Sequence, residues 1–332
     1  MMTPLLDIAL QVNSKWRRVS LKLESYNPGG SIKYRTARGL VEDLARTGQL
    51  RPGITLIEST SGNLGVALAL LSKEYDYRFI AVTDPKTDPT VLDHIRNLGA
   101  QVICVTGPET SGGYLLSRLA TVRDFLTAQP EAIWPNQYEN PSNPNAHYRQ
   151  TAPEICRQCP EMDAIFVAAS TGGTLAGIGR YLKARASSVR VVGVDMNGSA
   201  VFGMPSGKRL VTGMGSGRPS LFLRPDDYDD VVLVDDLAAI ATCHRLRNEL
   251  GLGLGGSSGA VIAACSRYLA VNEDIVQAVC VCPDSASNYL NSLYSQEWLA
   301  LNGLDLESDA AAGLFDDVKI LYNPGRCQVP CR

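Results

Sequence analysis

Several features that mark common classes of protein are missing from this sequence of 332 residues. Basic and acidic residues nearly balance, at 31 against 34, and no basic stripe with interleaved aromatic residues occurs, which argues against a nucleic-acid partner. The longest apolar runs, such as GVALALL, are far shorter than the roughly 20 residues of a membrane span. The N-terminus lacks the basic region and cleavage site of a signal peptide, so we expect a cytoplasmic protein without membrane contact.

The spacing of cysteine and histidine gives no sign of a metal centre. His94 and His244 lack metal-ligand spacing. Nine cysteines include one C-x-x-C pair, Cys156 and Cys159, without a second pair at zinc-ribbon spacing. An odd number of cysteines in a long chain without a leader also argues against a disulfide framework. We therefore expect no metal, and thiols that are mostly buried.

What the sequence does contain is a repeated alternation of β-branched runs and amphipathic stretches. The strand-like runs are RVSLKLE, ITLIES, RFIAVT, AQVICVT, DAIFVAAS, VRVVGVD, DVVLVD and AVCVCP. Helical segments such as SIKYRTARGLVEDLARTG and GNLGVALALLSKEY lie between them. This order predicts an α/β fold with parallel sheets flanked by helices, and such folds bind ligands at the carboxyl ends of their strands.

The length of the chain predicts two domains. We expect a small domain at 36–144 and a large one that combines 1–35 with 145–310, while 311–332 form a C-terminal tail without chemistry. The chain would cross between the domains near the turn NPGGSIK and near the loop PNQYENPSNPN. His147 lies at the second crossing, and we expect a structural role for it.

The stretch NPGGSIKYRTA, residues 27–37, places Lys33 three residues after a Gly-Gly pair. Asn-Pro-Gly-Gly is strong turn punctuation, so Lys33 could simply open a solvated helix. Alternatively, a flat and bulky group approaches the backbone here and Lys33 binds it covalently. A lysine that forms a Schiff base must be deprotonated, and a partly desolvated slot lined by glycine favours that state.

Four loops contain glycines or hydroxyls; three of them follow a strand, and the third in chain order opens an apolar helix. They are ESTSGNLG (58–65), STGGTLAGIG (170–179), GLGGSSGA (253–260) and CPDSASNYL (282–290). One such loop alone could be a capped turn, but the second fits a monophosphate better than a triphosphate or dinucleotide, since it matches neither a Walker A loop nor G-x-G-x-x-G. Together with an isolated lysine, four loops fit pyridoxal 5'-phosphate, which has a phosphate, an aldehyde and a flat ring.

The motifs NPGGSIK, TSGNLG, STGGTLAG, GGSSGA and PDSASNYL, in this order, resemble those of fold-type II pyridoxal-phosphate enzymes of the cysteine synthase and cystathionine β-synthase family. The resemblance covers roughly residues 3–300. It implies a two-lobed, tryptophan-synthase-β-like fold with a large cofactor-binding domain and a small, mobile substrate-binding domain. It also implies amino-acid substrates and a homodimer. Tyr34 departs from the family pattern, which commonly has Asp after the lysine, and the leading residues of the family's opening Gly-x-Thr-Pro-Leu segment are missing.

The same resemblance implies roles for individual residues. Lys33 would bind the cofactor as a Schiff base and then serve as acid and base, Asn63 would hydrogen-bond the ring hydroxyl, and Ser285 would meet the pyridine nitrogen. A neutral hydroxyl at that nitrogen favours β-elimination over chemistry that needs a full carbanion sink. The cofactor's phosphate would be held by Thr171, Gly172, Gly173 and Thr174, with Ser170 beside them. The carboxylate of the amino-acid substrate would be held by Thr60, Ser61, Gly62 and Gln137.

Stretches outside these motifs, among them DPK, GGYLLSRLATV, NQYEN and VGVDMNGSAVFG, resemble the branch of the family that supplies 2,3-diaminopropionate for siderophores and peptide antibiotics. The implied reaction is a β-replacement, in which phosphate leaves O-phospho-L-serine and the amine of L-glutamate adds to the β-carbon. These anions need cationic and hydroxyl donors, for which Arg118 and Tyr138 are the candidates, with Ser170. Arg118 could instead be a solvated helix residue, and Arg218 and Lys86 are as consistent with surface charges.

Three alternative functions stay open at this point. The first is a cysteine synthase that uses sulfide and O-acetyl- or O-phosphoserine. The second is an elimination enzyme, such as a serine or threonine deaminase, which needs no second substrate. The third is an inactive relative that binds a partner or regulates; Tyr34 and the short N-terminus suit it, whereas Lys33, Asn63 and the phosphate loop speak against it.

Overall fold

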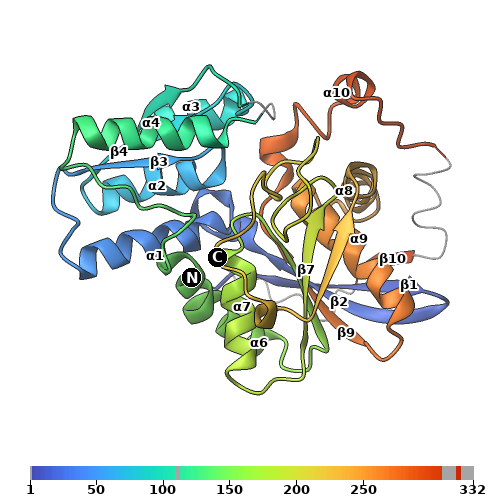
Figure 1. Ribbon diagram of the computed structural model, residues 1–332. Helices are drawn as coiled ribbons and strands as arrows, with labels where there is room; N and C mark the ends of the chain where they lie inside the picture. The colour runs from blue at the N-terminus through green and yellow to red at the C-terminus, as the bar shows by residue number, and fades with distance from the viewer. Residues whose placement is uncertain (1, 110–112, 309–318, 323–332) are drawn as a thin grey trace. The chain divides into compact units, whose positions relative to one another are not determined.

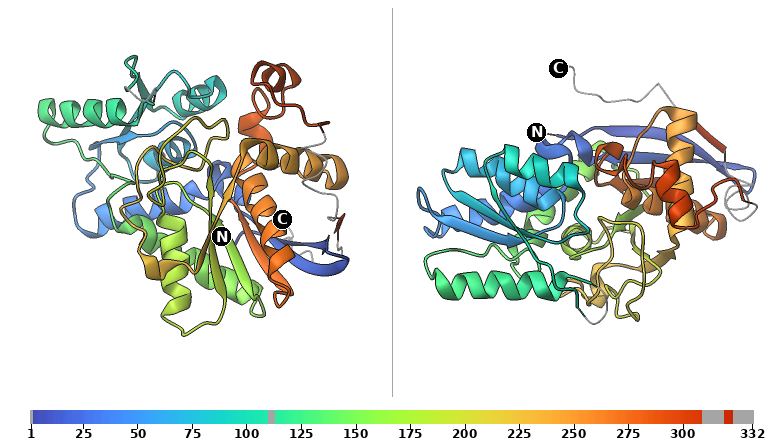
Figure 2. Two further views of the ribbon diagram at one scale, coloured as in Figure 1. Left: turned by 45° about the vertical axis from the view of Figure 1, so that its right-hand side comes forward. Right: turned by 90° about the horizontal axis from the view of Figure 1, so that it is seen from above.

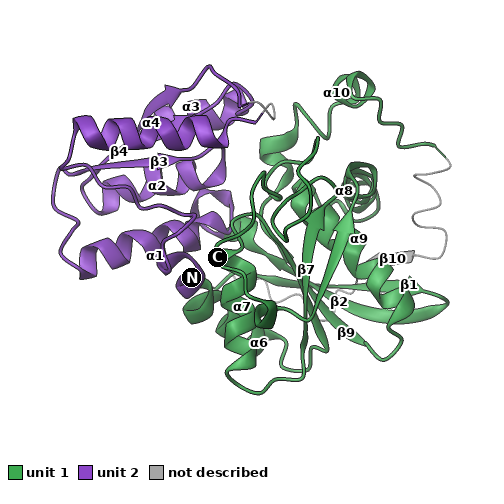
Figure 3. Ribbon diagram, in the orientation of Figure 1, with its two compact units in different colours: residues 1–26, 147–332 green, residues 27–146 purple. Residues whose placement is uncertain are grey.

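The expected strands form two separate sheets in the computed structural model, which describes residues 2–109, 113–308 and, for the backbone alone, 319–322. The chain divides into two compact units, unit 1 with residues 1–26 and 147–332 and unit 2 with residues 27–146 (Figure 3). The domain boundaries predicted from the sequence lay between residues 35 and 36 and between residues 144 and 145. Residues 27–35 join unit 2 because their turn packs on its helix α2 (Asn63–Glu74).

Unit 1 is built on a seven-stranded sheet in the order β10-β1-β2-β9-β6-β7-β8. Strands β2, β9, β6, β7 and β8 run parallel, and β1 pairs antiparallel with β2 and with β10. The β1–β2 hairpin is the long blue ribbon in Figure 2. The strands are β1 (Leu5–Val12), β2 (Lys15–Leu23), β6 (Ala164–Ala168), β7 (Arg190–Met196), β8 (Asp230–Val234), β9 (Gln277–Cys282) and β10 (Lys319–Tyr322).

Helices cover both faces of this sheet, as a parallel sheet requires. In Figure 1, α6 and α7 lie on one side of β7, and α8 and α9 lie on the other. Helix α9 approaches α8 so closely that a Cβ at Gly259 would lie 2.1 Å from the carbonyl oxygen of Ala239. The unit's helices are α6 (Ala152–Gln158), α7 (Gly173–Lys183), α8 (Asp236–Leu250), α9 (Gly256–Val271) and α10 (Gln296–Leu301), with the π-helix η3 (His147–Thr151) and the 3-10 turns η1 (Glu24–Tyr26), η4 (Pro225–Asp227) and η5 (Ala286–Tyr289).

Unit 2 has a parallel sheet of three strands in the order β3-β4-β5. Its largest hydrophobic cluster joins α1 and α2 to the sheet, and Tyr34 packs against that cluster. The strands are β3 (Thr55–Ser59), β4 (Arg78–Thr83) and β5 (Gln101–Cys104). The helices are η2 (Pro28–Gly30), α1 (Lys33–Arg46), α2, α3 (Pro89–Asn97), α4 (Leu115–Ala128) and α5 (Ser142–Ala146).

The predicted fold class is confirmed, and every strand-like run of the sequence overlaps one of the strands β2–β9. Two strands were not predicted. Strand β1 has the run LLDIALQV, and β10 lies within the stretch expected to be a tail, where it pairs with β1. The other residues of that tail, 311–318 and 323–332, lie outside the described part of the chain.

Neither a membrane-spanning helix nor a metal-binding cluster occurs among the described residues. No helix among them is long and apolar enough to cross a membrane. No group of three or more His, Cys, Asp and Glu side chains in this part of the chain could hold a metal ion. The described cysteines are all free thiols, and five of the seven are buried: Cys159, Cys243, Cys265, Cys280 and Cys282.

Candidate active site

The predicted phosphate loop, Ser170–Thr174, lies in unit 1 between the carboxyl end of β6 and the start of α7. Gly172 caps the helix with a φ of 87°, a left-handed conformation that glycine favours. A Cβ at this position would lie 2.2 Å from Ser220 Oγ. Helix α7 has eleven residues, and the N–H groups of its first turn have no partner within the helix. Such N–H groups beside the partly buried hydroxyls of Thr171 and Thr174 fit a phosphate group.

A second segment, residues 215–223, is hydrogen-bonded to the phosphate loop. Ser220 Oγ donates to the carbonyl oxygen of Thr171 at 2.6 Å and accepts from the backbone N–H of Phe222 at 3.2 Å. Ser170 Oγ donates to the carbonyl oxygen of Gly215 at 3.3 Å. This segment contains Arg218, a partly buried residue whose own N–H donates to Ser216 Oγ. The polar stretch GSGRPS therefore shapes the loop.

His147 contacts the phosphate loop as well, which the sequence analysis missed. Its ring is fully buried and lies in the π-helix η3. Nδ1 is 2.9 Å from Thr151 Oγ1, and Nε2 is 3.2 Å from Thr174 Oγ1. The ring thus holds the side chain of Thr174 in one orientation. Only the i, i+4 spacing of His147 and Thr151 is visible in the sequence, and it gives no hint of Thr174.

The third and fourth glycine- or hydroxyl-bearing loops come together in unit 1. Ser285 follows β9 and forms an antiparallel bridge with Leu254. The N–H of Gly255 donates to the carbonyl oxygen of Asp284 at 3.2 Å, and Tyr289 donates to Asp284 Oδ2 at 2.6 Å. A Cβ at Gly255 would lie 1.9 Å from Asp284 Oδ1, so glycine is needed there. These contacts fix the backbone of Ser285.

Lys33 is the first residue of α1 in unit 2 and is partly buried. The preceding turn contains Gly29 and Gly30, both with a φ of 75°. A Cβ at Gly29 would lie 2.7 Å from Leu70 Cδ1, because the turn packs directly on α2. The glycines thus let the backbone turn tightly before the lysine. Arg35, next to the unusual Tyr34, is buried.

The stretch Thr60–Asn63 connects β3 to α2 at the carboxyl end of β3. The N–H of Thr60 donates to the carbonyl oxygen of Val82 in β4, and Thr60 Oγ1 accepts from the N–H of Gly65 at 3.0 Å. Ser61 is exposed and Asn63 is the first residue of α2. Gln137 lies beside this stretch, because its Nε2 donates to the carbonyl oxygen of Ser59 at 2.9 Å. The structure therefore brings the predicted carboxylate-binding residues together within unit 2.

Arg118 is not a solvated helix residue, because it is 92% buried in α4. Its Nη1 lies 3.2 Å from Oδ2 of Asp84, a buried residue directly after β4. Since Val82 pairs with Ser59 across the sheet, Asp84 and the Thr60 stretch lie at the same carboxyl edge. A buried guanidinium thus lies close to the predicted carboxylate-binding residues.

Two other predicted residues of unit 2 are less enclosed. Tyr138 is partly buried, and its N–H donates to Asn136 Oδ1 at 3.3 Å. Lys86 is exposed, with its Nζ 5.6 Å from the centre of the Tyr114 ring.

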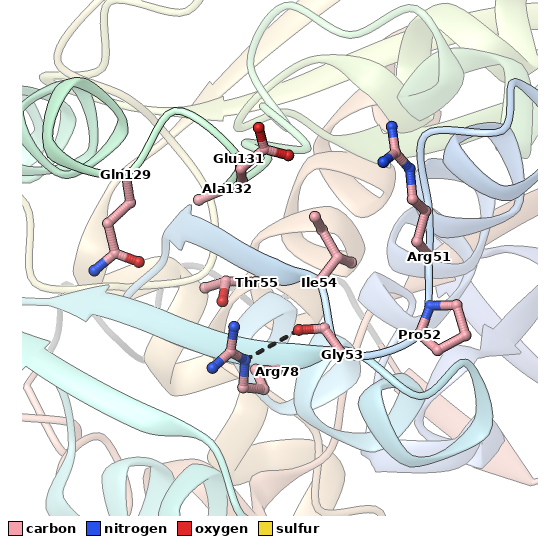
Figure 4. Close-up of a pocket in the computed structure, with 9 residues that line it drawn as sticks. All are labelled: Arg51, Pro52, Gly53, Ile54, Thr55, Arg78, Gln129, Glu131 and Ala132. Carbon is pink, nitrogen blue, oxygen red and sulfur yellow. Dashed lines mark hydrogen bonds between the residues drawn. The ribbon is translucent and has the colours of Figure 1, made fainter.

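A pocket in unit 2 opens at the other edge of the three-stranded sheet, at the amino ends of β3 and β4 (Figure 4). Arg78 Nε donates to the carbonyl oxygen of Gly53 inside it at 3.1 Å. None of the predicted site residues lines it; the lining residues are Arg51, Pro52, Gly53, Ile54, Thr55, Arg78, Gln129, Glu131 and Ala132. Because α/β folds bind ligands at carboxyl ends of strands, this pocket is no candidate for the catalytic site.

Residues 2–284 match the model of a protein family described as pyridoxal-phosphate dependent enzyme. Two curated relatives are named N-(2-amino-2-carboxyethyl)-L-glutamate synthase. The one from Ralstonia nicotianae is 42% identical over 90% of this chain and 88% of its own length, and the one from Cupriavidus metallidurans is 41% identical over 90% and 89%. Among solved structures, a hydrogen sulfide-producing enzyme from Fusobacterium nucleatum aligns with a TM-score of 0.84 and 26% identity, covering 97% of this chain and 96% of the other.

Proposed function

Because this chain belongs to the pyridoxal-phosphate-dependent enzymes, we propose that it is a β-replacement enzyme that makes N-(2-amino-2-carboxyethyl)-L-glutamate. Its substrates would be O-phospho-L-serine and L-glutamate, and phosphate would be released. The observation that carries this proposal is the 41–42% identity, over 90% of the chain, with two proteins of that name. The proposal includes a homodimer in the cytoplasm whose product is a source of 2,3-diaminopropionate for siderophore or peptide products.

Unit 1 would hold the cofactor's phosphate and ring nitrogen. Pyridoxal phosphate supplies the electron sink that makes the α-proton of an amino acid acidic. The N–H groups at the start of α7, with the hydroxyls of Thr171 and Thr174, would bind the phosphate. The Ser285 hydroxyl would face the ring nitrogen, held by the bridge to Leu254. His147 supports this assignment, because it fixes the Thr174 hydroxyl.

Unit 2 would supply the reacting lysine and the binding groups for the amino acid. Lys33 Nζ would bind the cofactor covalently and then move the proton at the α-carbon, and Asn63 would bind the ring hydroxyl. The substrate's α-carboxylate would lie against Thr60, Ser61 and Gly62 with Gln137. The first turn of α2 has no side-chain cap, and its N–H groups with the hydroxyl of the exposed Ser61 suit a carboxylate there.

The surroundings of Arg118 favour a substrate that has a second anionic group besides its α-carboxylate. Arg118 is buried, and among the described residues no acceptor reaches its Nε. Its Nη1 faces Asp84 Oδ2 at 3.2 Å. A guanidinium whose Nε still has a donor available can bind the phosphate of O-phosphoserine or a carboxylate of glutamate. Tyr138 would be a further donor to that anion.

The test is mass spectrometry of cofactor-loaded protein incubated with O-phospho-L-serine alone, with L-glutamate, or with sulfide. A glutamate-dependent adduct with release of phosphate would support the proposal. If cysteine forms from sulfide and no glutamate adduct appears, the protein is a cysteine synthase. If pyruvate forms without any adduct, the protein is an elimination enzyme. Lys33→Ala is the control that must abolish every product, and a colourless wild-type protein would point to an inactive relative.

A further inference from the structure

Glu58 is a fully buried carboxylate at the carboxyl end of β3 that the proposed reaction does not use. Its oxygens accept three N–H hydrogen bonds. Oε1 accepts from Trp134 Nε1 at 2.8 Å and from the backbone N–H of Ser59 at 2.9 Å, and Oε2 accepts from the backbone N–H of Gln137 at 3.1 Å. In the described part of the chain, none of its hydrogen-bond partners carries a charge.

Burying a carboxylate in this way costs free energy. Without a paired cation, the loss of hydration is offset only by neutral N–H donors. The balance is visible in its acidity: burial raises the pKa of Glu58 to about 7, although the N–H groups of Trp134, Gln137, Ser59 and Asn136 lower it. An apolar side chain would avoid this cost in a strand that is otherwise buried. The position therefore calls for an explanation other than stability.

The three bonds join the two segments assigned to the substrate's α-carboxylate. Ser59 leads into Thr60–Gly62, and Gln137 comes from a segment 79 residues away. The Gln137 side chain closes the junction by donating to the carbonyl oxygen of Ser59 at 2.9 Å, and Asn143 Nδ2 donates to the carbonyl oxygen of Gln137 at 2.7 Å. We propose that Glu58 is a positioning residue whose ionised carboxylate fixes Gln137 against the Ser59–Gly62 segment and so shapes the subsite for the amino acid's α-carboxylate. This inference rests on the proposed function for the location of that subsite.

Only the ionised carboxylate can serve all three donors at once. A protonated Glu58, or a glutamine in its place, would present a donor to one of the N–H groups and lose that bond. The groups that face Glu58 are Trp134, Ser59, Gln137 and Asn136, and none of them titrates near neutral pH. Wild-type affinity for an α-amino acid should therefore fall as the pH drops through about 7.

The experiment is a titration of the cofactor-loaded protein with L-serine, followed by the absorbance of the cofactor, at several pH values between 6 and 8.5. L-serine is used because the phosphate of O-phosphoserine itself titrates near pH 6. We expect Glu58→Gln to raise the dissociation constant about tenfold at pH 8 and to remove the step in affinity near pH 7, leaving only the gradual change caused by the amine of L-serine. The exposed Glu131→Gln is the matched control, and it should keep the wild-type profile.

A second variant keeps the carboxylate and removes one donor. Trp134→Phe weakens stabilisation of the ionised form, so the midpoint of the pH profile should move upward. Equal dissociation constants in wild type and Glu58→Gln, or a midpoint that Trp134→Phe leaves in place, would overturn the inference. The titration needs no second substrate, so it tests only the role of Glu58. If the proposed function is wrong, the product assay shows it, because no glutamate-dependent product forms.

Discussion

The phosphate loop allows a sharp test at Gly172, where two physical effects can be separated. An alanine there would keep a left-handed backbone, which costs an L-residue about 1–2 kcal/mol. Its Cβ would also lie 2.2 Å from Ser220 Oγ and 2.8 Å from Leu223 Cγ, an overlap of the kind that costs about 1–3 kcal/mol. We therefore expect Gly172→Ala to destabilise the protein by about 2–5 kcal/mol.

The matched control is Gly251→Ala in the same unit. Gly251 has a φ of 69° at the end of α8, but nothing lies within 4 Å of a Cβ built on it. This variant therefore has the backbone cost without the overlap. The double variant Gly172→Ala with Ser220→Ala removes the oxygen at 2.2 Å and should recover part of the difference.

Two assays distinguish the loop's shape from general stability. Thermal unfolding should show a midpoint that is several degrees lower for Gly172→Ala than for Gly251→Ala. Fluorescence titration of the cofactor-free protein with pyridoxal phosphate should show affinity at least tenfold weaker for Gly172→Ala and unchanged for Gly251→Ala. Equal unfolding midpoints for the two variants, with wild-type cofactor affinity in both, would refute the reasoning.

Three further predictions concern buried charges. Lys22 donates to Glu154, so Lys22→Met should lower the unfolding free energy in urea by about 3–5 kcal/mol, because the buried carboxylate of Glu154 then loses the charge of Lys22. Burial raises the pKa of Asp195 to about 6, so its contribution to stability falls as the pH rises from about 4 to 6, and Asp195→Asn should flatten that part of the stability curve. Arg118→Lys should weaken binding of O-phosphoserine more than binding of L-serine in absorbance titrations, since a lysine cannot form the bidentate contact.

Each of these has a clear opposite result. If the double variant Lys22→Met with Glu154→Leu were as unstable as Lys22→Met alone, the loss would not come from the buried charge of Glu154. Parallel stability curves of wild type and Asp195→Asn between pH 4 and 6 would mean that Asp195 does not titrate there. An equal loss for both amino acids in Arg118→Lys would remove Arg118 from recognition of the phosphate.

Much of the fold could be predicted because β-branched runs and glycine motifs are local signals. The strand RFIAVT coincides with β4, and STGGTLAG lies at the β6–α7 turn. Strand β1 was not predicted because a short apolar run such as LLDIALQV is equally consistent with a buried helix. Its pairing with neighbouring strands determines that it is extended. Strand β10 has only four residues and depends on pairing with β1, from the other end of the chain.

The contacts that shape the candidate site could not be predicted, because they join residues that are distant in the sequence. His147 is 27 residues from Thr174, Ser220 is 49 from Thr171 and Gln137 is 79 from Glu58. Periodicity reports which face of a single element is buried, and it carries no information about such pairs. The motifs therefore indicate where the chemistry lies, whereas the residues that hold the motifs in place emerge only from the structure.

A variant at the amino edge of the sheet in unit 2 is a negative control for the location of the substrate subsite at the carboxyl edge. The carboxyl edge carries Glu58, Thr60 and Asp84, whereas the pocket of Figure 4 lies at the amino edge. Arg78 is exposed there, and its Nε donates to the carbonyl oxygen of Gly53. Arg78→Ala should therefore leave both the cofactor spectrum and the affinity for L-serine unchanged. If it instead weakened amino-acid binding as strongly as Glu58→Gln, the location of the substrate subsite at the carboxyl edge would be wrong, because no contact of Arg78 shown in this unit reaches Gln137 or Thr60.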